Sequence, residues 1–335
     1  MPKSHAEGSI SVRVEVEGVL MVALFGSEDR LLKTLESTYP EVEVHARGNS
    51  IVLHGKSHQV AAAKQLVEEM SELIRAGQDL APQDFTRSAK MIDEGAARPA
   101  DVLSQSIISS RGKTIRPKTL GQKTYVDAID NNTIVFGIGP AGTGKTYLAM
   151  AKAVQALQRK EISRIILTRP AVEAGEKLGF LPGTLNDKID PYLRPLFDAL
   201  HDMLDPESIP KLMTSGTIEV APLAYMRGRT LNDAFIILDE AQNTTPEQMK
   251  MFLTRIGFGS KVVVTGDISQ IDVPDGRSGL VGLEKKLGSI DSLEFVRLDG
   301  SDVVRHRIVA DIVAAYEKFT SSSDEVRPRR NSRRD

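Results

Sequence analysis

The most informative segment of the sequence is Gly139-Pro-Ala-Gly-Thr-Gly-Lys-Thr146, which matches every fixed position of the pattern G-x-x-x-x-G-K-[ST]. An apolar run from Ile134 to Ile138 leads directly into it, and an amphipathic helix is predicted from Tyr147 to Lys160. A strand before the loop and a helix after it form the setting in which this pattern binds phosphates. The alternative is a glycine-rich turn with an incidental lysine. The setting favours a phosphate-binding loop, or P-loop.

The residue types of this loop suit a bound triphosphate with a metal ion. Glycines allow backbone N–H groups to turn inward around the phosphates, and the start of the following helix adds the positive end of its dipole. Lys145 is expected to reach the β- and γ-phosphates, and the Thr146 hydroxyl is expected to ligate Mg²⁺. The sequence thus predicts ATP and Mg²⁺ as cofactors. The predicted nucleotide-binding residues of the loop are Gly139, Pro140, Ala141, Gly142, Thr143, Gly144, Lys145 and Thr146.

Two carboxylates, Asp239 and Glu240, follow a second apolar run, Phe235–Leu238. The carboxyl end of a buried parallel strand points to the edge of the sheet where ligands bind. Asp239 is therefore predicted to hold Mg²⁺, directly or through water, and Glu240 to orient or deprotonate the attacking water. The alternative is that the pair only caps the strand and begins a turn. Beside a P-loop, we prefer the catalytic interpretation.

A third apolar run, Val262–Thr265, also ends in polar residues. A neutral amide such as Gln270 can contact the γ-phosphate and report its presence, and Asp267 can support the metal shell. The alternative for both is a strand followed by an Asp-capped turn.

Three further residues carry weaker signals. Gln122 lies just upstream of the first strand, where a side-chain amide could pair with the adenine edge; the alternative is an exposed residue at a helix start. Arg305 and Arg307 open the final predicted helix and could supply positive charge to the transition state. The alternative is that both arginines are solvated. The six histidines are scattered, so Mg²⁺ is the only metal we expect.

Short apolar runs alternate with helical segments from Leu120 to Phe319. This alternation implies right-handed crossovers and a parallel sheet covered by helices on both faces, so the predicted fold class is α/β. The predicted strands are Thr133–Ile138, Arg164–Thr168, Thr217–Ala221, Ala234–Leu238, Lys261–Thr265 and Leu293–Leu298.

The chain divides into four predicted zones. Residues 9–75 form a small α+β unit, residues 76–119 a linker with a short helix near Phe85–Asp93, residues 120–319 the P-loop domain, and residues 320–335 a disordered Arg-rich tail. In the first zone, strands and helices are expected at Ile10–Leu24 (an alternating and then apolar stretch), Leu31–Tyr39, Val42–His45, Ile51–His54 and Gln59–Ile74.

Composition limits the possible partners and compartments. A net charge of −2 argues against coating nucleic acid by bulk charge, so any contact must come from a local patch such as the five arginines between Arg327 and Asp335. The absence of cysteine excludes disulfides, thiolate catalysis and Cys-ligated zinc. The N-terminus has no signal-peptide pattern, and the apolar run Val19–Phe25 is too short to span a membrane. We expect a cytoplasmic protein without membrane contact.

Several segments resemble known families. The carboxylate segment, the segment after Val264 and Gln122 are similar to motifs of superfamily 1 helicases. Over about residues 110 to 318 the chain resembles the PhoH-like ATPase family, in the stretches Leu167–Gly183, Asp190–Pro195 and Gly300–His306. The resemblance implies a RecA-like core that binds and hydrolyses ATP, a context in RNA metabolism and a YbeY-type endoribonuclease as partner. It also implies that Gln122 contacts adenine and that Arg305 is an arginine finger.

The N-terminal unit resembles, more loosely, a KH-type RNA-binding module in its helix-strand-strand-helix order. A KH module clamps the nucleic-acid backbone with a G-x-x-G loop. Here Gly26-Ser-Glu-Asp29 lacks the second glycine and carries two acidic residues. RNA binding and protein docking therefore remain alternative roles for this unit.

Other functions fit the motifs less well. A GTPase would need N-K-x-D, and Asn186–Asp190 has an inserted residue. The Asp-Glu pair and the polar segment after Val264 disfavour a small-molecule kinase, and a nucleotide-gated scaffold that docks a nuclease is the main alternative. About 180 residues follow the P-loop, enough for one RecA-like domain but not two. A neighbouring subunit could complete the site, so we expect a homo-oligomeric ring, a hexamer by resemblance to RecA-like ring ATPases.

Overall fold

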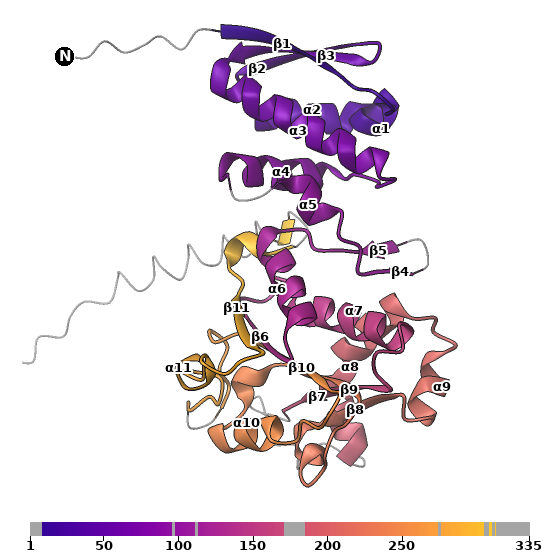
Figure 1. The fold of residues 1–335 in the computed structure, drawn as a ribbon, viewed down its shortest axis with the longest axis vertical. Coiled ribbons are helices and arrows are strands. Elements are labelled where there is room, and N and C mark those ends of the chain that lie inside the picture. Colours follow the sequence, from indigo (N-terminus) through magenta and orange to yellow (C-terminus); the bar gives the residue numbers. More distant parts are fainter. Residues whose placement is uncertain are drawn as a thin grey trace, which may run out of the picture.

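The computed structural model describes residues 9–95, 98–110, 113–170, 185–273, 276–304, 308–309 and 312. Figure 1 shows a small N-terminal unit and a larger unit stacked along the long axis, with α4 (Pro82–Asp93) and α5 (Pro99–Leu103) between them. None of the helices in these residues is long and apolar enough to cross a membrane.

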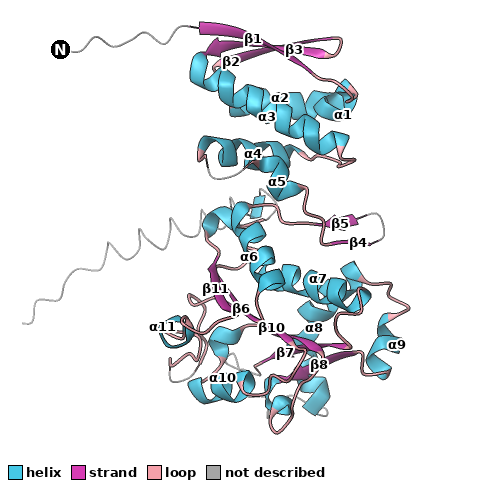
Figure 2. Ribbon diagram, in the orientation of Figure 1, coloured by secondary structure: helices cyan, strands magenta, loops and turns pink. Residues whose placement is uncertain are grey.

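The larger unit is built on a six-stranded sheet in which every pair of neighbours is parallel (Figure 2). Its strand order is β11-β6-β10-β9-β7-β8. All six predicted strands are confirmed to within one residue at each end, and with them the α/β fold class of a RecA-like P-loop NTPase. The strands are β6 (Ile134–Ile138), β7 (Arg164–Arg169), β8 (Ile218–Pro222), β9 (Ala234–Leu238), β10 (Lys261–Gly266) and β11 (Leu293–Arg297).

Both faces of this sheet are covered, which explains why its strands are mostly apolar and do not alternate with polar residues. In β9, Phe235 and Ile237 belong to one core cluster, whereas Ile236 and Leu238 belong to the other. Successive strand residues point to opposite faces, so two separate cores form on one sheet. The first core is covered by α6 (Leu120–Asn131), α7 (Lys145–Gln158) and α8 (Leu185–Met203), and the second by α10 (Pro246–Leu253) and the short α11 (Glu284–Leu287).

The strand order brings the predicted site residues together. Strand β10 pairs with β6 on one side and with β9 on the other. The P-loop after β6 and the carboxylates after β9 therefore flank the end of β10. Because all three strands are parallel, these three connections lie at the same edge of the sheet.

The N-terminal unit has an antiparallel sheet of order β1-β3-β2 packed on helices. The alternating part of the stretch Ile10–Leu24 is a strand, but its apolar end turns into a helix. The buried side of the longest helix follows the predicted periodicity, with Val60, Ala63 and Met70 in the core. The elements of the N-terminal unit are β1 (Ser9–Glu15), α1 (Met21–Phe25), η1 (Ser27–Asp29), α2 (Arg30–Thr38), β2 (Val42–Arg47), β3 (Ser50–Lys56) and α3 (Ser57–Arg75).

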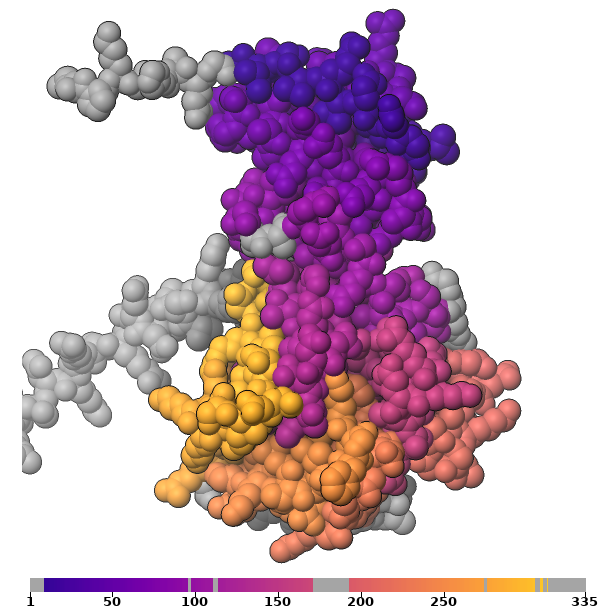
Figure 3. Space-filling view, in the orientation of Figure 1, coloured from indigo at the N-terminus to yellow at the C-terminus, as the bar shows by residue number. Residues whose placement is uncertain are grey.

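Residues 76–119 are folded over most of their length. The predicted short helix near Phe85–Asp93 is α4, but further elements follow where only a linker was expected. Helix α4 adds Phe85 and Ala89 to the N-terminal core, whereas the hairpin β4 (Ile108–Ser110) and β5 (Lys113–Ile115) packs on the core under α7. The elements are so short that only a few apolar residues mark each one. Figure 3 shows this segment in contact with both units. The tail, residues 320–335, lies outside the described residues.

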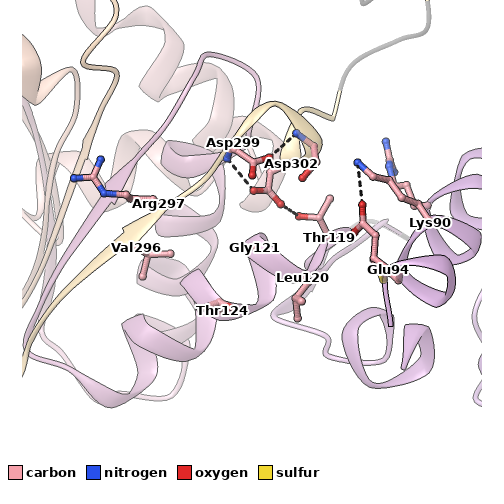
Figure 4. Close-up of a pocket in the computed structure, with 13 residues that line it drawn as sticks. Lys90, Glu94, Thr119, Leu120, Gly121, Thr124, Val296, Arg297, Asp299 and Asp302 are labelled. Carbon is pink, nitrogen blue, oxygen red and sulfur yellow. Dashed lines mark hydrogen bonds and ion pairs between the residues drawn. The ribbon is translucent and has the colours of Figure 1, made fainter. Parts of the chain in front are cut away.

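A cavity of about 320 Å³ lies where α4 meets the start of α6 and the end of β11 (Figure 4). Beside it, the buried carboxylate of Asp302 accepts hydrogen bonds from the Thr119 hydroxyl (2.5 Å) and the Asp299 N–H (3.0 Å). A Cβ atom on Gly121 would lie 2.4 Å from Asp302 Oδ2, so only glycine lets the carboxylate approach the first turn of α6. This contact fixes the helix that carries Gln122.

Candidate nucleotide-binding site

The P-loop connects β6 to α7 at the edge of the sheet. The Gly139 N–H donates to Gly266 O of β10 (3.1 Å), which ties the start of the loop to the neighbouring strand. Gly142 and Gly144 have positive φ angles of 88° and 77°, a region that favours glycine. Gly144 precedes the first residue of α7, so the N-terminal N–H groups of that helix face the loop.

Lys145 is held inside the loop. Its Nζ donates to Gly139 O (2.6 Å) and Pro140 O (2.8 Å), and it lies 3.4 Å from Thr143 Oγ1. The side chain is largely buried. The ammonium group thus already lies where the loop encloses phosphates.

Three oxygen atoms converge at the end of β10. Thr146 Oγ1 donates to Asp239 Oδ1 (2.6 Å), Thr265 Oγ1 donates to the same oxygen (2.8 Å), and the two hydroxyls are 3.3 Å apart. A hydroxyl and a carboxylate suit Mg²⁺, which takes few protein ligands and completes its shell with phosphates and water. The described residues contain no group of three or more His, Cys, Asp or Glu that could hold a metal ion. The Thr146 hydroxyl and the Asp239 carboxylate are oxygen donors that fit Mg²⁺ bound together with a nucleotide.

Glu240 has a strained backbone and two side-chain partners. Its φ is 51°, a left-handed conformation that is uncommon for a residue other than glycine. Its Oε2 accepts a hydrogen bond from Gln242 Nε2 (2.6 Å), and its Oε1 lies 3.4 Å from Nη2 of Arg169. Such strain is found where the surroundings hold a residue in place, as they do at catalytic sites.

Asp267 braces the P-loop instead of the metal ligands. Its Oδ2 accepts the Ala141 N–H (3.1 Å), and its Oδ1 accepts the backbone and hydroxyl groups of Ser269 (2.9 and 2.6 Å). Gln270 is exposed and lines the same cavity of about 280 Å³ as Lys145 and Glu240. The described position of Gln270 is compatible with its predicted contact to the γ-phosphate.

A larger cavity of about 630 Å³ adjoins the loop and suits a nucleoside. Gln122 lines it, but the amide is engaged by backbone groups: Nε2 donates to Thr143 O (3.0 Å), and Oε1 accepts the Lys118 N–H (2.8 Å). Burial, and then the Arg87 guanidinium, lower the pKa of the Lys118 side chain below its usual value. Gln122 thus links the P-loop to the start of α6, and its contact with adenine stays a prediction. The apolar part of the lining comes from Ile115, Leu148 and Val304.

Arg305 and Arg307 lie outside the described residues. The neighbouring Val304 is described, and its N–H donates to Gly142 O of the P-loop (2.9 Å). The roles predicted for the two arginines stay predictions.

Four residues near the site were not assigned a role from the sequence: Tyr125, Arg169, Gln242 and Thr265. Thr265 is a polar residue at the end of an apolar strand, which is a usable signal. Tyr125 is fully buried, and its hydroxyl donates to Lys145 O (3.2 Å); burial and then the charge of Asp239 raise the pKa of its phenol. The contacts of Tyr125, Arg169 and Gln242 depend on which strands and helices are neighbours in space, and the sequence alone does not give that order.

Comparison with known proteins agrees with this geometry. Residues 114–317 match the family model described as PhoH-like protein. This chain belongs to the PhoH-like family. A PhoH-like protein of Mycobacterium tuberculosis is 62% identical over 317 residues, which cover 94% of this chain and 90% of that protein. The PhoH-like protein of Bacillus subtilis is 52% identical over 300 residues, 89% of this chain and 94% of that protein.

Protein PhoH of Escherichia coli matches a shorter part of the chain. It is 44% identical over 198 residues, which cover 58% of this chain and 56% of that protein. The family resemblance found in the sequence is therefore confirmed, and the PhoH-like chain carries a P-loop NTPase core that binds nucleotides.

Proposed function

We propose that this PhoH-like protein hydrolyses ATP with Mg²⁺. The observation that supports the proposal best is the convergence of Thr146 and Thr265 on one oxygen of Asp239, with Glu240 next in the chain. A hydroxyl from the P-loop and a strand-end carboxylate are the protein ligands that Mg²⁺ uses in P-loop ATPases. The adjoining Glu240 lines the same cavity as Lys145.

Each residue then has a distinct part in the reaction. The P-loop amides and Lys145 bind the triphosphate, and Lys145 exchanges its contacts with Gly139 O and Pro140 O for phosphate oxygens. Thr146 and Asp239 would hold Mg²⁺, which would neutralise the negative charge that develops on the phosphates. Glu240 orients the attacking water and accepts its proton. Gln270 contacts the γ-phosphate.

Two variants test the assignment. Lys145→Ala should abolish nucleotide binding or turnover, because it removes the positive charge from the phosphates. Glu240→Gln should bind ATP normally but stop hydrolysis, because the metal ligands remain and only the carboxylate that acts on water is lost. The measurements are ATP affinity and steady-state turnover. Hydrolysis by Glu240→Gln at the wild-type rate would contradict the catalytic role of Glu240.

We further propose that the protein acts in RNA metabolism with a YbeY-type endoribonuclease. Support comes from the family resemblance and from the antiparallel α+β arrangement of the N-terminal unit. The acidic residues Glu28 and Asp29 in its loop favour protein docking as the alternative role. RNA should raise ATP turnover if RNA is a substrate, whereas a nuclease-docking scaffold should show little stimulation.

The assembly proposed for this function is a homo-oligomeric ring, a hexamer by resemblance to RecA-like ring ATPases, in which a neighbouring subunit completes each site. Its support is that the described part of the chain holds a single six-stranded core, whereas superfamily 1 helicases bind ATP between two such cores. In this arrangement Arg305 acts on the nucleotide of the adjoining subunit. The competing arrangement is a monomer in which Arg305 acts within its own chain. Mass measurement with ATP bound distinguishes the two.

A further inference from the structure

A cation lies against the carboxylate that the proposed reaction uses. Arg169 is the last residue of β7, and its Nη2 is 3.4 Å from Glu240 Oε1. The two side chains are 21% and 34% exposed, so water screens the pair only in part. The other carboxylate oxygen accepts the hydrogen bond from Gln242. Each oxygen of Glu240 therefore has its own partner.

The backbone fixes the position from which Arg169 reaches Glu240. Strand β7 pairs with β9 up to Thr168 and Leu238, and the Asp239 N–H donates to Thr168 O (2.9 Å). Pro170 follows Arg169 and disfavours the helical region for it, which keeps Arg169 extended. The ends of the two strands, and with them the arginine and the glutamate, are thus held side by side.

The partner on the other oxygen is equally constrained. Gln242 is buried, and its Oε1 accepts the Asp267 N–H (3.0 Å). A Cβ atom on Gly266 would lie 2.5 Å from Leu280 Cδ2 and 3.1 Å from Gln242 Oε1, so the glycine leaves room for both side chains. Since Asp267 also binds the Ala141 N–H, Gln242 is anchored to the P-loop. Glu240 is therefore held between a rigid amide and the guanidinium of Arg169.

We propose that Arg169 is a positioning residue for Glu240: its ion pair sets the rotation of the carboxylate toward the attacking water. This inference rests on the ATPase function proposed above. The last torsion of a glutamate side chain has a broad, soft preference, so a single hydrogen bond leaves the carboxylate plane free to turn. A second donor on the other oxygen fixes that plane. Small errors in the placement of a reacting group cost much of the rate.

The proposal predicts a split between kcat and KM. Arg169→Ala should lower kcat by roughly 10-fold to 100-fold, the range found when partners that orient functional side chains are removed. The KM for ATP should change little, because Arg169 acts through Glu240 and not on the phosphates. Arg169→Lys should recover part of kcat, since it restores the charge but not the planar guanidinium. Arg164→Ala, at the opposite end of β7, is the matched control and should behave as wild type.

A double-mutant cycle provides the decisive experiment. Glu240→Asp withdraws the carboxylate from Arg169 by one methylene while leaving a carboxylate in the site. In that background, Arg169→Ala should change kcat by less than about 2-fold, because the contact is already lost. Binding of a non-hydrolysable ATP analogue and the melting temperature report folding of every variant.

Three results would overturn the inference. One is a wild-type kcat in Arg169→Ala. Another is that Arg169→Ala lowers kcat equally in the wild-type and Glu240→Asp backgrounds and raises the KM for ATP, which would mean that Arg169 contacts phosphate directly. The third is that Arg169→Lys behaves like Arg169→Ala. Absence of ATP hydrolysis by the wild-type protein would instead overturn the ATPase proposal, and this inference with it. Wild-type hydrolysis by Glu240→Gln would contradict only the catalytic role of Glu240, so the two failures are distinguishable.

Discussion

Replacing Gly137 by alanine should destabilise the sheet and weaken nucleotide binding together, because the new methyl group meets the ring of Tyr125. A Cβ atom at position 137 would lie 2.6 Å from Tyr125 Cε2, 2.8 Å from Cζ and 2.9 Å from the hydroxyl oxygen. Carbon atoms in contact normally stand about 3.5–4.0 Å apart, so the ring or the strand must shift by about 1 Å. The ring is fully buried, beside Gly137 of β6 and with its hydroxyl against Lys145 O at the start of α7.

Overpacking of this kind costs about 1–3 kcal/mol, and occasionally more. For a domain of this size each kcal/mol lowers the melting temperature by about 2–4 °C, so we expect a fall of roughly 2–12 °C. The hydroxyl of Tyr125 also donates to Lys145 O at the start of α7, so displacing the ring disturbs the P-loop. ATP affinity should therefore fall as well.

Thermal melting with and without nucleotide measures both effects. Gly300→Ala is the control, because a Cβ atom there would meet nothing within 4 Å. The reasoning would be refuted if Gly137→Ala melted within about 1 °C of the control. Normal stability with a lost ATP affinity would refute the coupling through packing.

Three more predictions follow from the site and the tail. Thr265→Val removes one of the two hydroxyls that orient the Asp239 carboxylate, so the Mg²⁺ concentration for half-maximal turnover should rise by about 10-fold; an unchanged Mg²⁺ titration would mean that Thr265 is dispensable. Deleting residues 321–335 should lower RNA affinity and flatten its salt dependence. An unchanged dependence of RNA affinity on salt concentration in filter binding would mean that the tail binds no polyanion. Mixing inactive Lys145→Ala with inactive Arg305→Ala should recover activity if sites are shared between subunits, and no recovery despite subunit exchange would exclude the ring.

The strands of the core could be predicted because the fold demands an unusual composition from them. A parallel strand buried on both faces must be apolar throughout, and Ala234–Leu238 is buried at all five positions. Residues 76–119 could not be predicted in the same way. Helix α5 has only five residues and β4 only three, and such short elements carry too few apolar residues to show a period.

The candidate site could be predicted residue by residue but not as a network. The P-loop, Asp239 and Glu240 each follow an apolar run, and that position alone points to the ligand edge of the sheet. The partners of these residues depend on which strands are neighbours. Thr265 meets Asp239 because β10 lies beside β9, and Arg169 meets Glu240 because β7 lies on the other side of β9. No spacing along the chain encodes that order.

The hydrogen bonds within the P-loop bear on how a nucleotide binds. Lys145 is bonded to two loop carbonyls, the Ala141 N–H to Asp267, and the Thr143 carbonyl to Gln122. A phosphate that enters therefore exchanges hydrogen bonds instead of adding new ones, and each exchange contributes little net free energy. These hydrogen bonds favour binding because they order the loop beforehand. A loop that is already held in shape loses less conformational freedom when the nucleotide binds. Affinity should thus depend on the bracing residues as well as on those that touch phosphate, which makes Asp267 and Gln122 part of the binding site even where neither contacts the nucleotide.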